Sequence, residues 1–203
     1  MKILAASDLH GDSNAAGTLA KKAKKENADL VILAGDLSIF GNGLEGILKP
    51  FSDLNKKVAI IPGNHDSEAD IFMLKKRYPD ILYDLHNYAF KIGDVGFFGC
   101  GLANIGPNEL SESQLKKRIE DSFKYVKDAK KRVMVVHVPP YKTKLDRIGK
   151  NTNVGSTAVR ESIIKFKPEK CICGHIHETF GLEDTLDKTS IFNVGPVGRI
   201  IEI

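Results

Sequence analysis

The sequence predicts an α/β fold, and three observations support this prediction. Short apolar runs rich in β-branched and aliphatic residues alternate with segments that have the period and the caps of helices. A hairpin signal interrupts this alternation near the middle of the chain, which indicates an antiparallel pair of strands. Several apolar runs end in polar side chains, and ligand sites of α/β proteins lie at the carboxyl ends of strands. We therefore expect the functional site at that edge of the sheet.

The first part of the chain alternates strands with helices. Residues 30–34 are continuously apolar, as expected for a strand that is buried on both faces. Pro79 stops the third helix. The expected elements are strands at 2–6, 30–34 and 57–61 and helices at 13–27, 44–54 and 68–77.

The second part begins with two β-rich runs that are separated only by Gly93 and Asp94, which predicts a hairpin. No internal repeat, low-complexity tract or linker is visible, so we expect a single domain over residues 1–203. The expected elements are strands at 88–92, 95–100, 132–136, 170–173, 190–194 and 199–203 and helices at 111–128 and 156–166.

The composition is that of a soluble globular protein, with 42% apolar and 28% charged residues. Lysine and arginine exceed aspartate and glutamate by 30 − 26 = 4, which suits an anionic substrate without indicating a nucleic-acid binder. Cys171 and Cys173 share one face of a strand, and with Cys100 they are expected to be reduced core thiols. The sequence contains neither a signal-peptide pattern nor an apolar run that could span a membrane, so we expect a cytoplasmic protein.

Five of the six histidines follow apolar runs, and only His86 lies elsewhere, where we expect it to be structural or to face solvent. Residues two apart in an extended segment point to the same side, so Asp8 with His10, and His175 with His177, are expected to converge. Some polar residues follow a glycine, which either lets backbones approach closely or makes a plain turn. The polar side chains at the strand ends are those of Asp8, His10, Asp36, Asn64, His65, His137, His175 and His177.

This donor set combines imidazole nitrogens, carboxylate oxygens and one amide oxygen, without a thiolate. Such donors suit borderline divalent ions, namely Mn, Fe, Zn, Co or Ni, better than a soft metal or calcium. There are more donors than one tetrahedral ion needs, and two ions that share a carboxylate would use them all. We therefore expect two divalent metal ions.

The ordered blocks DLHGD, GDL, GNHD, HVPP and GHIH resemble the calcineurin-like metallophosphoesterases, whose pattern is D-x-H, G-D, G-N-H-D/E, H and G-H-x-H. The resemblance extends from Asp8 to His177. It implies a four-layer α/β/β/α sandwich of two mixed β-sheets flanked by helices. It also implies one metal held by Asp8, His10, Asp36 and His177 and another held by Asp36, Asn64, His137 and His175.

The activity implied by the resemblance is hydrolysis of a small phosphate ester, either a monoester or a diester. Two divalent ions, two aspartates and a bridging hydroxide leave a net charge of about +1, which would attract a phosphoryl group for attack by that hydroxide. The resemblance makes His65 the general acid on the side of the leaving group. Asp66 has no role that the sequence assigns.

One departure concerns the support of His65. Protein phosphatases of this superfamily carry GDxVDRG, with an aspartate that braces the histidine of GNH, whereas this chain has GDLSIFG. Ile39 and Phe40 occupy the positions of the aspartate and the arginine. The residue that orients His65 stays open, and a protein phosphatase is disfavoured.

The loop after His137 is rich in basic residues and is followed by a helix that carries another. It is either an ordinary solvated loop or a segment that contacts the substrate. The basic residues concerned are Lys142, Lys144, Arg147, Lys150 and Arg160.

Two other functions compete with a phosphoesterase for small substrates. A nuclease of the same superfamily would act on nucleic acid, but the chain lacks an extra domain and an aromatic-basic platform to bind it. A non-catalytic protein-binding scaffold on the same fold would have lost ligands, and none is lost here. The sequence does not identify the substrate or the oligomeric state.

Overall fold

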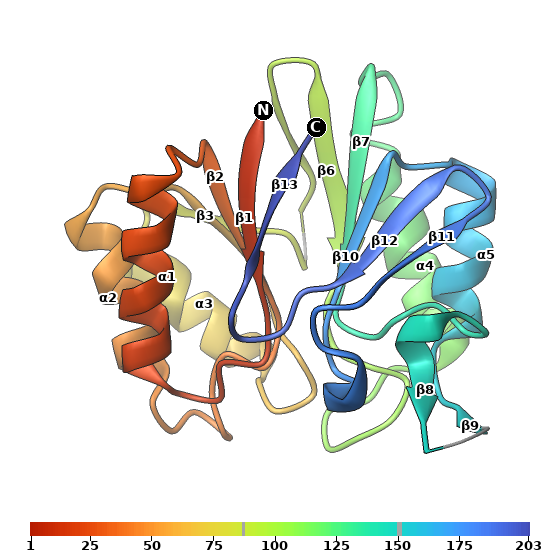
Figure 1. The fold of residues 1–203 in the computed structure, drawn as a ribbon, viewed down its shortest axis with the longest axis horizontal. Helices are drawn as coiled ribbons and strands as arrows, with labels where there is room; N and C mark the ends of the chain where they lie inside the picture. Colours follow the sequence, from red (N-terminus) through yellow and green to blue (C-terminus); the bar gives the residue numbers. More distant parts are fainter. Residues whose placement is uncertain (87, 150–151) are drawn as a thin grey trace.

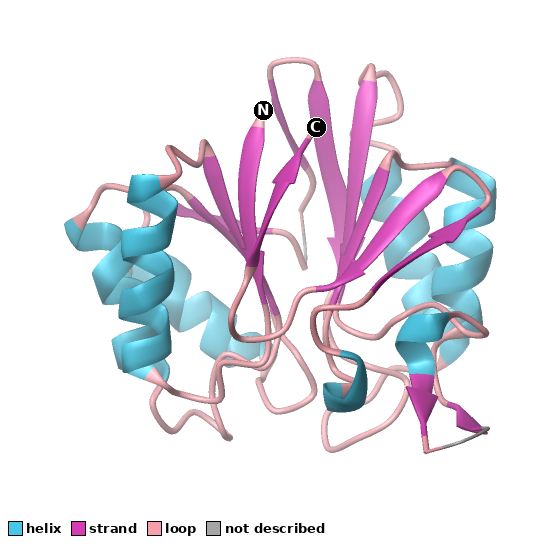
Figure 2. Ribbon diagram, viewed as in Figure 1, coloured by secondary structure: helices cyan, strands magenta, loops and turns pink. Residues whose placement is uncertain are grey.

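The computed structural model describes residues 1–86, 88–149 and 152–203. The protein has four layers, in which two β-sheets face each other and helices cover the outer face of each sheet (Figures 1 and 2). The predicted α/β/β/α sandwich is confirmed. No helix within the described residues is long and apolar enough to cross a bilayer.

The first sheet has the strand order β13-β1-β2-β3-β4. β13 pairs antiparallel with β1, and the other neighbours are parallel, so β1, β2 and β3 all end at the same edge. The strands are β1 (Lys2–Ala6), β2 (Leu30–Ala34), β3 (Val58–Ile61), β4 (Leu82–Asp84) and β13 (Arg199–Glu202).

The second sheet has the strand order β11-β12-β10-β7-β6-β5. β5 and β6 form the predicted antiparallel hairpin, and β6, β7, β10 and β12 are parallel to one another. The strands are β5 (Phe90–Ile92), β6 (Val95–Cys100), β7 (Lys131–Val136), β10 (Lys170–Cys173), β11 (Glu183–Leu186) and β12 (Thr189–Asn193). A separate small hairpin is formed by β8 (Arg147–Ile148) and β9 (Thr152–Asn153).

Three helices pack on the first sheet and two on the second (Figure 1). The first group is α1 (Ser13–Lys25), α2 (Leu44–Asp53) and α3 (Glu68–Arg77), and the second is α4 (Glu112–Phe123) and α5 (Thr157–Phe166). Short 3-10 turns, η1 (Lys144–Asp146) and η2 (His177–Thr179), lie in the loops after β7 and β10.

Alternating side chains of each strand build separate cores. In β1, Leu4 and Ala6 pack under the helices, whereas Ile3 and Ala5 face the second sheet. The three cysteines are buried and unpaired, and they belong to the core between the second sheet and its helices, as predicted. Burial of both faces explains why the central strands read as continuous apolar runs.

Four strands were not predicted, and one helix is clearly shorter than expected. β4 has three residues and β11 is an acidic edge strand, so neither has an apolar run. β8 and β9 have two residues each, in and after the basic loop. The helix expected over 111–128 ends at Phe123, and turns then carry Val126 into the core.

Candidate functional site

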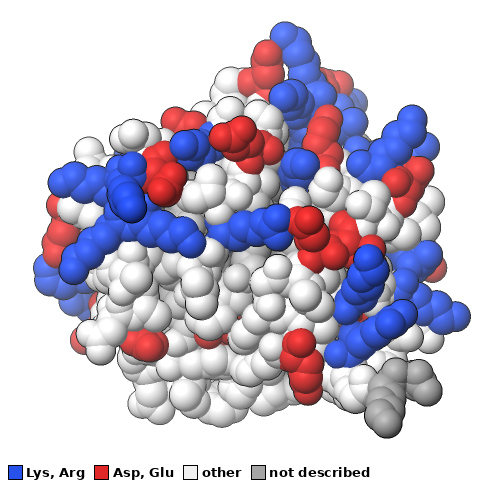
Figure 3. Space-filling view, in the orientation of Figure 1, with Lys and Arg blue, Asp and Glu red and all other residues white. Residues whose placement is uncertain are grey.

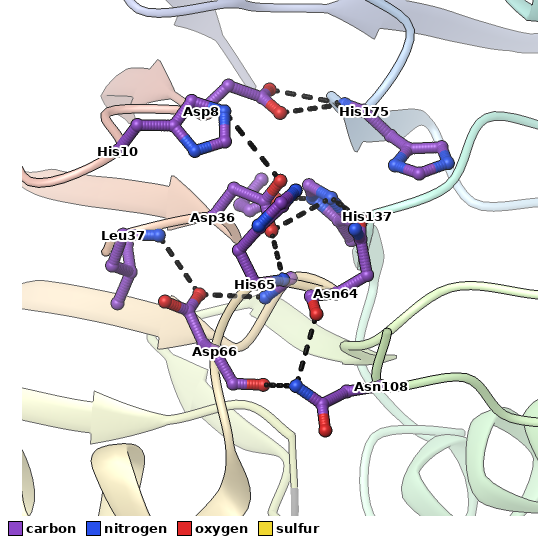
Figure 4. A network of polar contacts seen from close by, with 12 residues as sticks. Asp8, His10, Asp36, Leu37, Asn64, His65, Asp66, Asn108, His137 and His175 are labelled. Atoms are coloured by element: carbon purple, nitrogen blue, oxygen red, sulfur yellow. Dashed lines mark hydrogen bonds and ion pairs between the residues drawn. The ribbon is translucent and has the colours of Figure 1, made fainter. Parts of the chain in front are cut away.

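The parallel strands of both sheets end at one edge of the molecule, which is the lower edge in Figure 1. The loops after β1, β2 and β3 meet the loops after β7 and β10 there, as Figure 4 shows at close range. These loops carry every polar residue that the sequence placed at strand ends. The two sheets therefore share one site.

The first-sheet loops are turns that hold each other. Asp8, His10 and Asp36 have positive φ angles of 56°, 46° and 51°. The Asp8 N–H donates to the Gly35 carbonyl and the His10 N–H donates to the Asp36 carbonyl, both at 2.9 Å. Asp8 and His10 do converge, but the expectation that an extended segment would bring them together is wrong. The left-handed turns do so, at a backbone cost that the paired loops offset.

Asp66 ties the loop after β2 to the loop after β3. Its buried carboxylate accepts four hydrogen bonds at 2.9 Å, from the N–H of Leu37, Ser38 and Gly63 and from the Ser38 hydroxyl. Figure 4 shows the bond from Leu37. Burial raises the pKa of Asp66 while the three N–H groups oppose that rise. The last residue of GNHD thus holds the loops that carry Asp36 and Asn64.

Two glycines allow carboxylates to approach the backbone. A Cβ atom on Gly63 would lie 2.0 Å from Asp36 Oδ1, and one on Gly174 would lie 2.4 Å from Asp8 Oδ2. Neither distance is possible for a side chain. Close approach, rather than a plain turn, explains the glycines before Asn64 and His175.

His137 reaches across from the second sheet to the first. Its Nδ1 lies 2.8 Å from the Ala34 carbonyl, so Nδ1 carries a proton and donates it. Its Nε2 lies 3.5 Å from Asp36 Oδ1 and 3.3 Å from Asn64 Oδ1. The backbone hydrogen bond aims Nε2 at two oxygen donors of the other sheet, which is the arrangement of a histidine ligand.

Two groups of ligand atoms are close enough to hold a cation. Within the described residues, one group is Asp8, His10 and His177 and the other is Asp8, Asp36 and His137, with the ligand atoms of each group within 4.8 Å of one another. His10 Nε2 is buried without a hydrogen-bond partner. It lies 3.8 Å from Asp36 Oδ2, and His177 Nε2 lies 3.7 Å from Asp8 Oδ1. An imidazole nitrogen buried without a partner beside carboxylates fits a metal site.

The electrostatics of the site also suit a cation. Burial alone would raise the pKa of Asp36, but His137 and the His65 N–H outweigh burial and hold that pKa well below its ordinary value. Burial opposes protonation of His137, yet Asp36 and Asp8 raise its pKa to about 9. Burial and the neighbouring His137 lower the pKa of His175 to about 4. Burial would also raise the pKa of Asp8, but His177, His137 and Ser7 outweigh burial and lower it. Asp8 and Asp36 are therefore both charged at neutral pH, and a cation at His137 Nε2 would replace a proton.

The sequence profile of the calcineurin-like phosphoesterases matches residues 1–179 of the chain. The chain belongs to the calcineurin-like phosphoesterase family. Proteins of this family normally bind divalent metal ions, and family membership indicates a hydrolase that acts on phosphoester bonds.

The similarity to individual proteins is consistent with this family assignment. The chain is 31% identical to an uncharacterized protein of Methanocaldococcus jannaschii over 206 aligned residues, which cover 97% of this chain and 88% of that protein. A crystal structure from Thermus thermophilus has a TM-score of 0.76 at 18% identity, covering 97% of this chain and 90% of that one. A dimetal phosphatase from Danio rerio has a TM-score of 0.63 at 12% identity, covering 97% and 88%. At these identities, the two structures show a shared fold.

His65 is held by its backbone. Its N–H donates to Asp36 Oδ1 at 2.9 Å, and its carbonyl accepts from the Phe40 N–H at 3.1 Å. Its Nδ1 is buried without a hydrogen-bond partner among the described residues. At the position where protein phosphatases of the family carry an aspartate, this chain has Ile39, which is 45% exposed. The His65 ring instead contacts the rings of Phe40 and His10, each with centroids 5.2 Å away.

Asn108 is a site residue that the sequence did not indicate. Its side-chain Nδ2 donates to the carbonyls of Asn64 and Asp66, both at 3.1 Å (Figure 4). It follows a glycine-rich uncharged loop rather than an apolar run, so no strand-end signal pointed to it. Its position depends on the contact of that loop with GNHD.

The basic residues predicted to bind substrate have other contacts. Lys144 lies 3.8 Å from Asp184 of β11, and Arg160 donates to the carbonyls of Tyr141 and Lys142 at 2.9 and 3.2 Å. The Lys142 ammonium lies 5.4 Å from the Tyr141 ring centroid. Arg147 is exposed in β8, and Lys150 lies outside the described residues. Their role in substrate binding stays a prediction.

His86 is structural, as one of the two expectations had it, and it does not face solvent. It is buried, and its Nδ1 accepts from the Gly101 N–H at 3.0 Å. Its Nε2 lies 3.2 Å from Glu68 Oε1 and also contacts Arg118. Burial lowers the pKa of His86 more than Glu68 raises it. His86 joins the segment after β4 to the end of β6.

Proposed function

We propose that the protein hydrolyses a small phosphate ester with two divalent metal ions at this site. The observation that carries the proposal is the convergence of oxygen donors from one sheet and imidazoles from the other around the partnerless His10 Nε2. The Danio rerio protein of the same fold is named a dimetal phosphatase, which supports a pair of ions. When bound, the ions would polarise the phosphoryl group and lower the pKa of the attacking water.

The residues proposed to hold the ions fall into two sets that share Asp36. The first set is Asp8, His10, Asp36 and His177, and the second is Asp36, Asn64, His137 and His175. Asp36 lies between the two sets, since its Oδ2 is 3.8 Å from His10 Nε2 of the first set and its Oδ1 is 3.5 Å from His137 Nε2 of the second. Asn64 is neutral, so it adds an oxygen ligand without cancelling the positive charge that attracts phosphate.

His65 is proposed to donate a proton to the leaving oxygen. Its ring lies beside that of His10 but is not needed in either set of ligands. General acid catalysis contributes about 10²- to 10⁴-fold, and it matters most for a poor leaving group such as an alkoxide. The substrate therefore lies with its phosphoryl group over the two sets of ligands and its leaving group toward His65.

A small substrate is favoured over a long nucleic acid. On the face in Figure 3, the lower edge where the strands end is mostly uncharged, and most lysine and arginine side chains lie above it or at its right-hand end. A nuclease surface carries a continuous basic track for the phosphate backbone. The cationic centre itself is the feature that would bind the single phosphate.

The test compares a phosphate monoester and a phosphate diester as substrates of the purified protein with Mn²⁺. The expected result is turnover of at least one ester and about two bound ions per chain by elemental analysis, with both lost in Asp36→Asn. Activity on neither ester together with no stoichiometric metal would favour the scaffold alternative. Strong preference for long DNA would favour the nuclease.

A further inference from the structure

An exposed aromatic ring lies next to His65. Phe40 belongs to the loop between β2 and α2 and keeps 59% of its surface exposed. Its ring centroid is 5.2 Å from that of His65, with the ring planes at 59°. A ring at this position borders the space that the leaving group would enter.

The backbone of Phe40 is in the left-handed region, with a φ angle of 52°. This conformation is unfavourable for a bulky residue, and glycine or asparagine would adopt it at lower cost. A solvent-exposed ring contributes little burial in return. Because Phe40 combines an unfavourable backbone with an unburied ring, folding alone does not explain it, and such outliers occur at functional sites.

Phe40 and His65 both line a pocket of about 300 Å³. The other lining residues are Ser67, Asp70 and Asn108. The volume is at the lower end of the range of small-molecule sites, which suits one part of a substrate. The pocket opens directly beside the proposed general acid.

Two of the polar residues that line the pocket offer it hydrogen-bond acceptors. Asp70 uses Oδ2 to accept from the Ser67 N–H at 2.7 Å and hydroxyl at 2.8 Å, in the capping box of α3. Asn108 uses Nδ2 to hold the GNHD loop. Within the part of the chain that the structure describes, the Oδ1 atoms of Asp70 and Asn108 accept no hydrogen bond, so they can accept from hydroxyl or amino groups.

We propose that this pocket binds the leaving group and that the leaving group is a nucleoside. Its base stacks on Phe40, and its hydroxyl or amino groups donate to Asp70 and Asn108. A flat ring that also carries hydrogen-bond donors can both stack on Phe40 and donate to the acceptor oxygens. An aliphatic alcohol can only donate to the acceptor oxygens. The inference rests on the proposed function, because it takes His65 to face the leaving group.

A binding test that needs no turnover uses the absence of tryptophan from the chain. Phe40→Trp introduces a single tryptophan, in the pocket, and we expect adenosine to quench the tryptophan emission saturably while ribose does not. The control is Tyr125→Trp, also exposed but located beyond the end of α4. Equal responses to adenosine and ribose, or equal responses of the two variants, would overturn the proposal.

A kinetic test compares adenosine 5′-monophosphate with ribose 5-phosphate, whose leaving oxygens are chemically alike. We expect kcat/KM to favour the nucleotide by about 5- to 100-fold, the range for stacking of one base on an aromatic side chain. Phe40→Gly should bring this ratio close to one, Phe40→Tyr should keep it, and Tyr125→Trp should leave it unchanged. A ratio that survives in Phe40→Gly would overturn the proposal.

The two tests separate this inference from the proposed function. Phe40→Gly should melt at or above the wild-type temperature, because glycine tolerates the left-handed backbone, so a lost preference does not reflect unfolding. Hydrolysis of both phosphates at equal rates would support the phosphoesterase and overturn the nucleoside pocket. Quenching of Phe40→Trp by adenosine without hydrolysis of either phosphate would support the pocket and contradict the phosphoesterase.

Discussion

The two sheets contribute different chemistry to one site. Every candidate oxygen ligand lies in a loop of the first sheet, whereas the second sheet contributes imidazole nitrogens alone. Each proposed set of ligands therefore takes members from both sheets, so bound ions would join the two halves of the sandwich. The oxygen ligands are Asp8, Asp36 and Asn64, and the second-sheet ligands are His137, His175 and His177.

The two halves also differ in how they position their ligands. The three first-sheet loops interlock through their backbones and through Asp66, and those after β1 and β2 contain left-handed residues, as the second-sheet loop does at His175. His137 directly follows the end of β7, and its Nδ1 is held by Ala34 of the first sheet. The His175 N–H likewise donates to Asp8 Oδ2 at 3.1 Å. The first sheet thus builds the site, and it also orients the histidines that the second sheet adds.

The largest effect is expected where the two halves share a ligand. Asp36→Asn removes the proposed bridging carboxylate, so both ions should be lost and kcat should fall by about 10⁴-fold or more, which corresponds to several kcal/mol of transition-state stabilisation. Steady-state kinetics with Mn²⁺ and elemental analysis measure both quantities. The control is Asp53→Asn, at an exposed ion pair with Lys49 at the end of α2. Full metal content in Asp36→Asn would contradict the proposed bridge.

His65 lies in a loop of the first sheet, after β3, but is not one of the proposed ligands. His65→Asn should keep both ions and lose about 10²- to 10⁴-fold in kcat on an alkyl phosphate ester, because the alkoxide needs a proton. The loss should be smaller on an aryl ester, whose leaving group is stable as an anion. Unchanged turnover on the alkyl ester would exclude a role as general acid.

Each half of the molecule has a buried aspartate that accepts backbone hydrogen bonds, so replacing each of them compares the two halves directly. Asp66 accepts hydrogen bonds from the first-sheet loops, and Asp146 accepts from the N–H groups of Lys142, Thr143 and Gly155 at 2.9 to 3.1 Å in the loop after β7. Replacing either by asparagine should lower the free energy of unfolding by about 3 kcal/mol, because charge-assisted hydrogen bonds are lost and donors are left unpaired. Denaturant titration checks this. Only Asp66→Asn should also weaken metal binding, and equal weakening by Asp146→Asn would remove the distinction.

Metal removal should loosen the connection between the sheets. Each ion at 100 times its Kd stabilises the folded state by about 2.7 kcal/mol. For a chain of this size, that corresponds to a Tm about 5 to 10 °C higher per bound ion with Mn²⁺ than with EDTA. Thermal melts of wild type and Asp36→Asn provide the comparison, and an equal shift in the variant would place the ions elsewhere.

His86 links the halves without a metal, and its effect should be the smallest. Its folded-state pKa is lowered, mainly by burial, so below about pH 6.5 the unfolded chain binds a proton that the folded chain does not. Stability should therefore fall as the pH drops below 6.5, by up to about 1.4 kcal/mol per pH unit. His86→Asn keeps an acceptor for the Gly101 N–H and should flatten this slope. Parallel slopes from denaturation at pH 7 to 5 would contradict the assignment.

Much of the fold and the candidate ligands could be predicted from the sequence. The central strands are buried on both faces and read as apolar runs, and their ends carry the polar residues. Short or edge strands such as β4 and β11 lack that signal, because one face or most of their length is polar. Asn108 and Phe40 could not be assigned for another reason. Their roles depend on loops that meet only after the sheets pack.

By itself, the sequence determined which side chains stand at the ends of buried strands, because strand burial and the order of residues are local properties. Only the tertiary structure decided which of those side chains meet. It aimed His137 through a carbonyl 103 positions away in the chain, gave Asp66 its role between two loops, and placed Phe40 against His65. These contacts arise from the packing of one sheet on the other, and no local pattern encodes that packing.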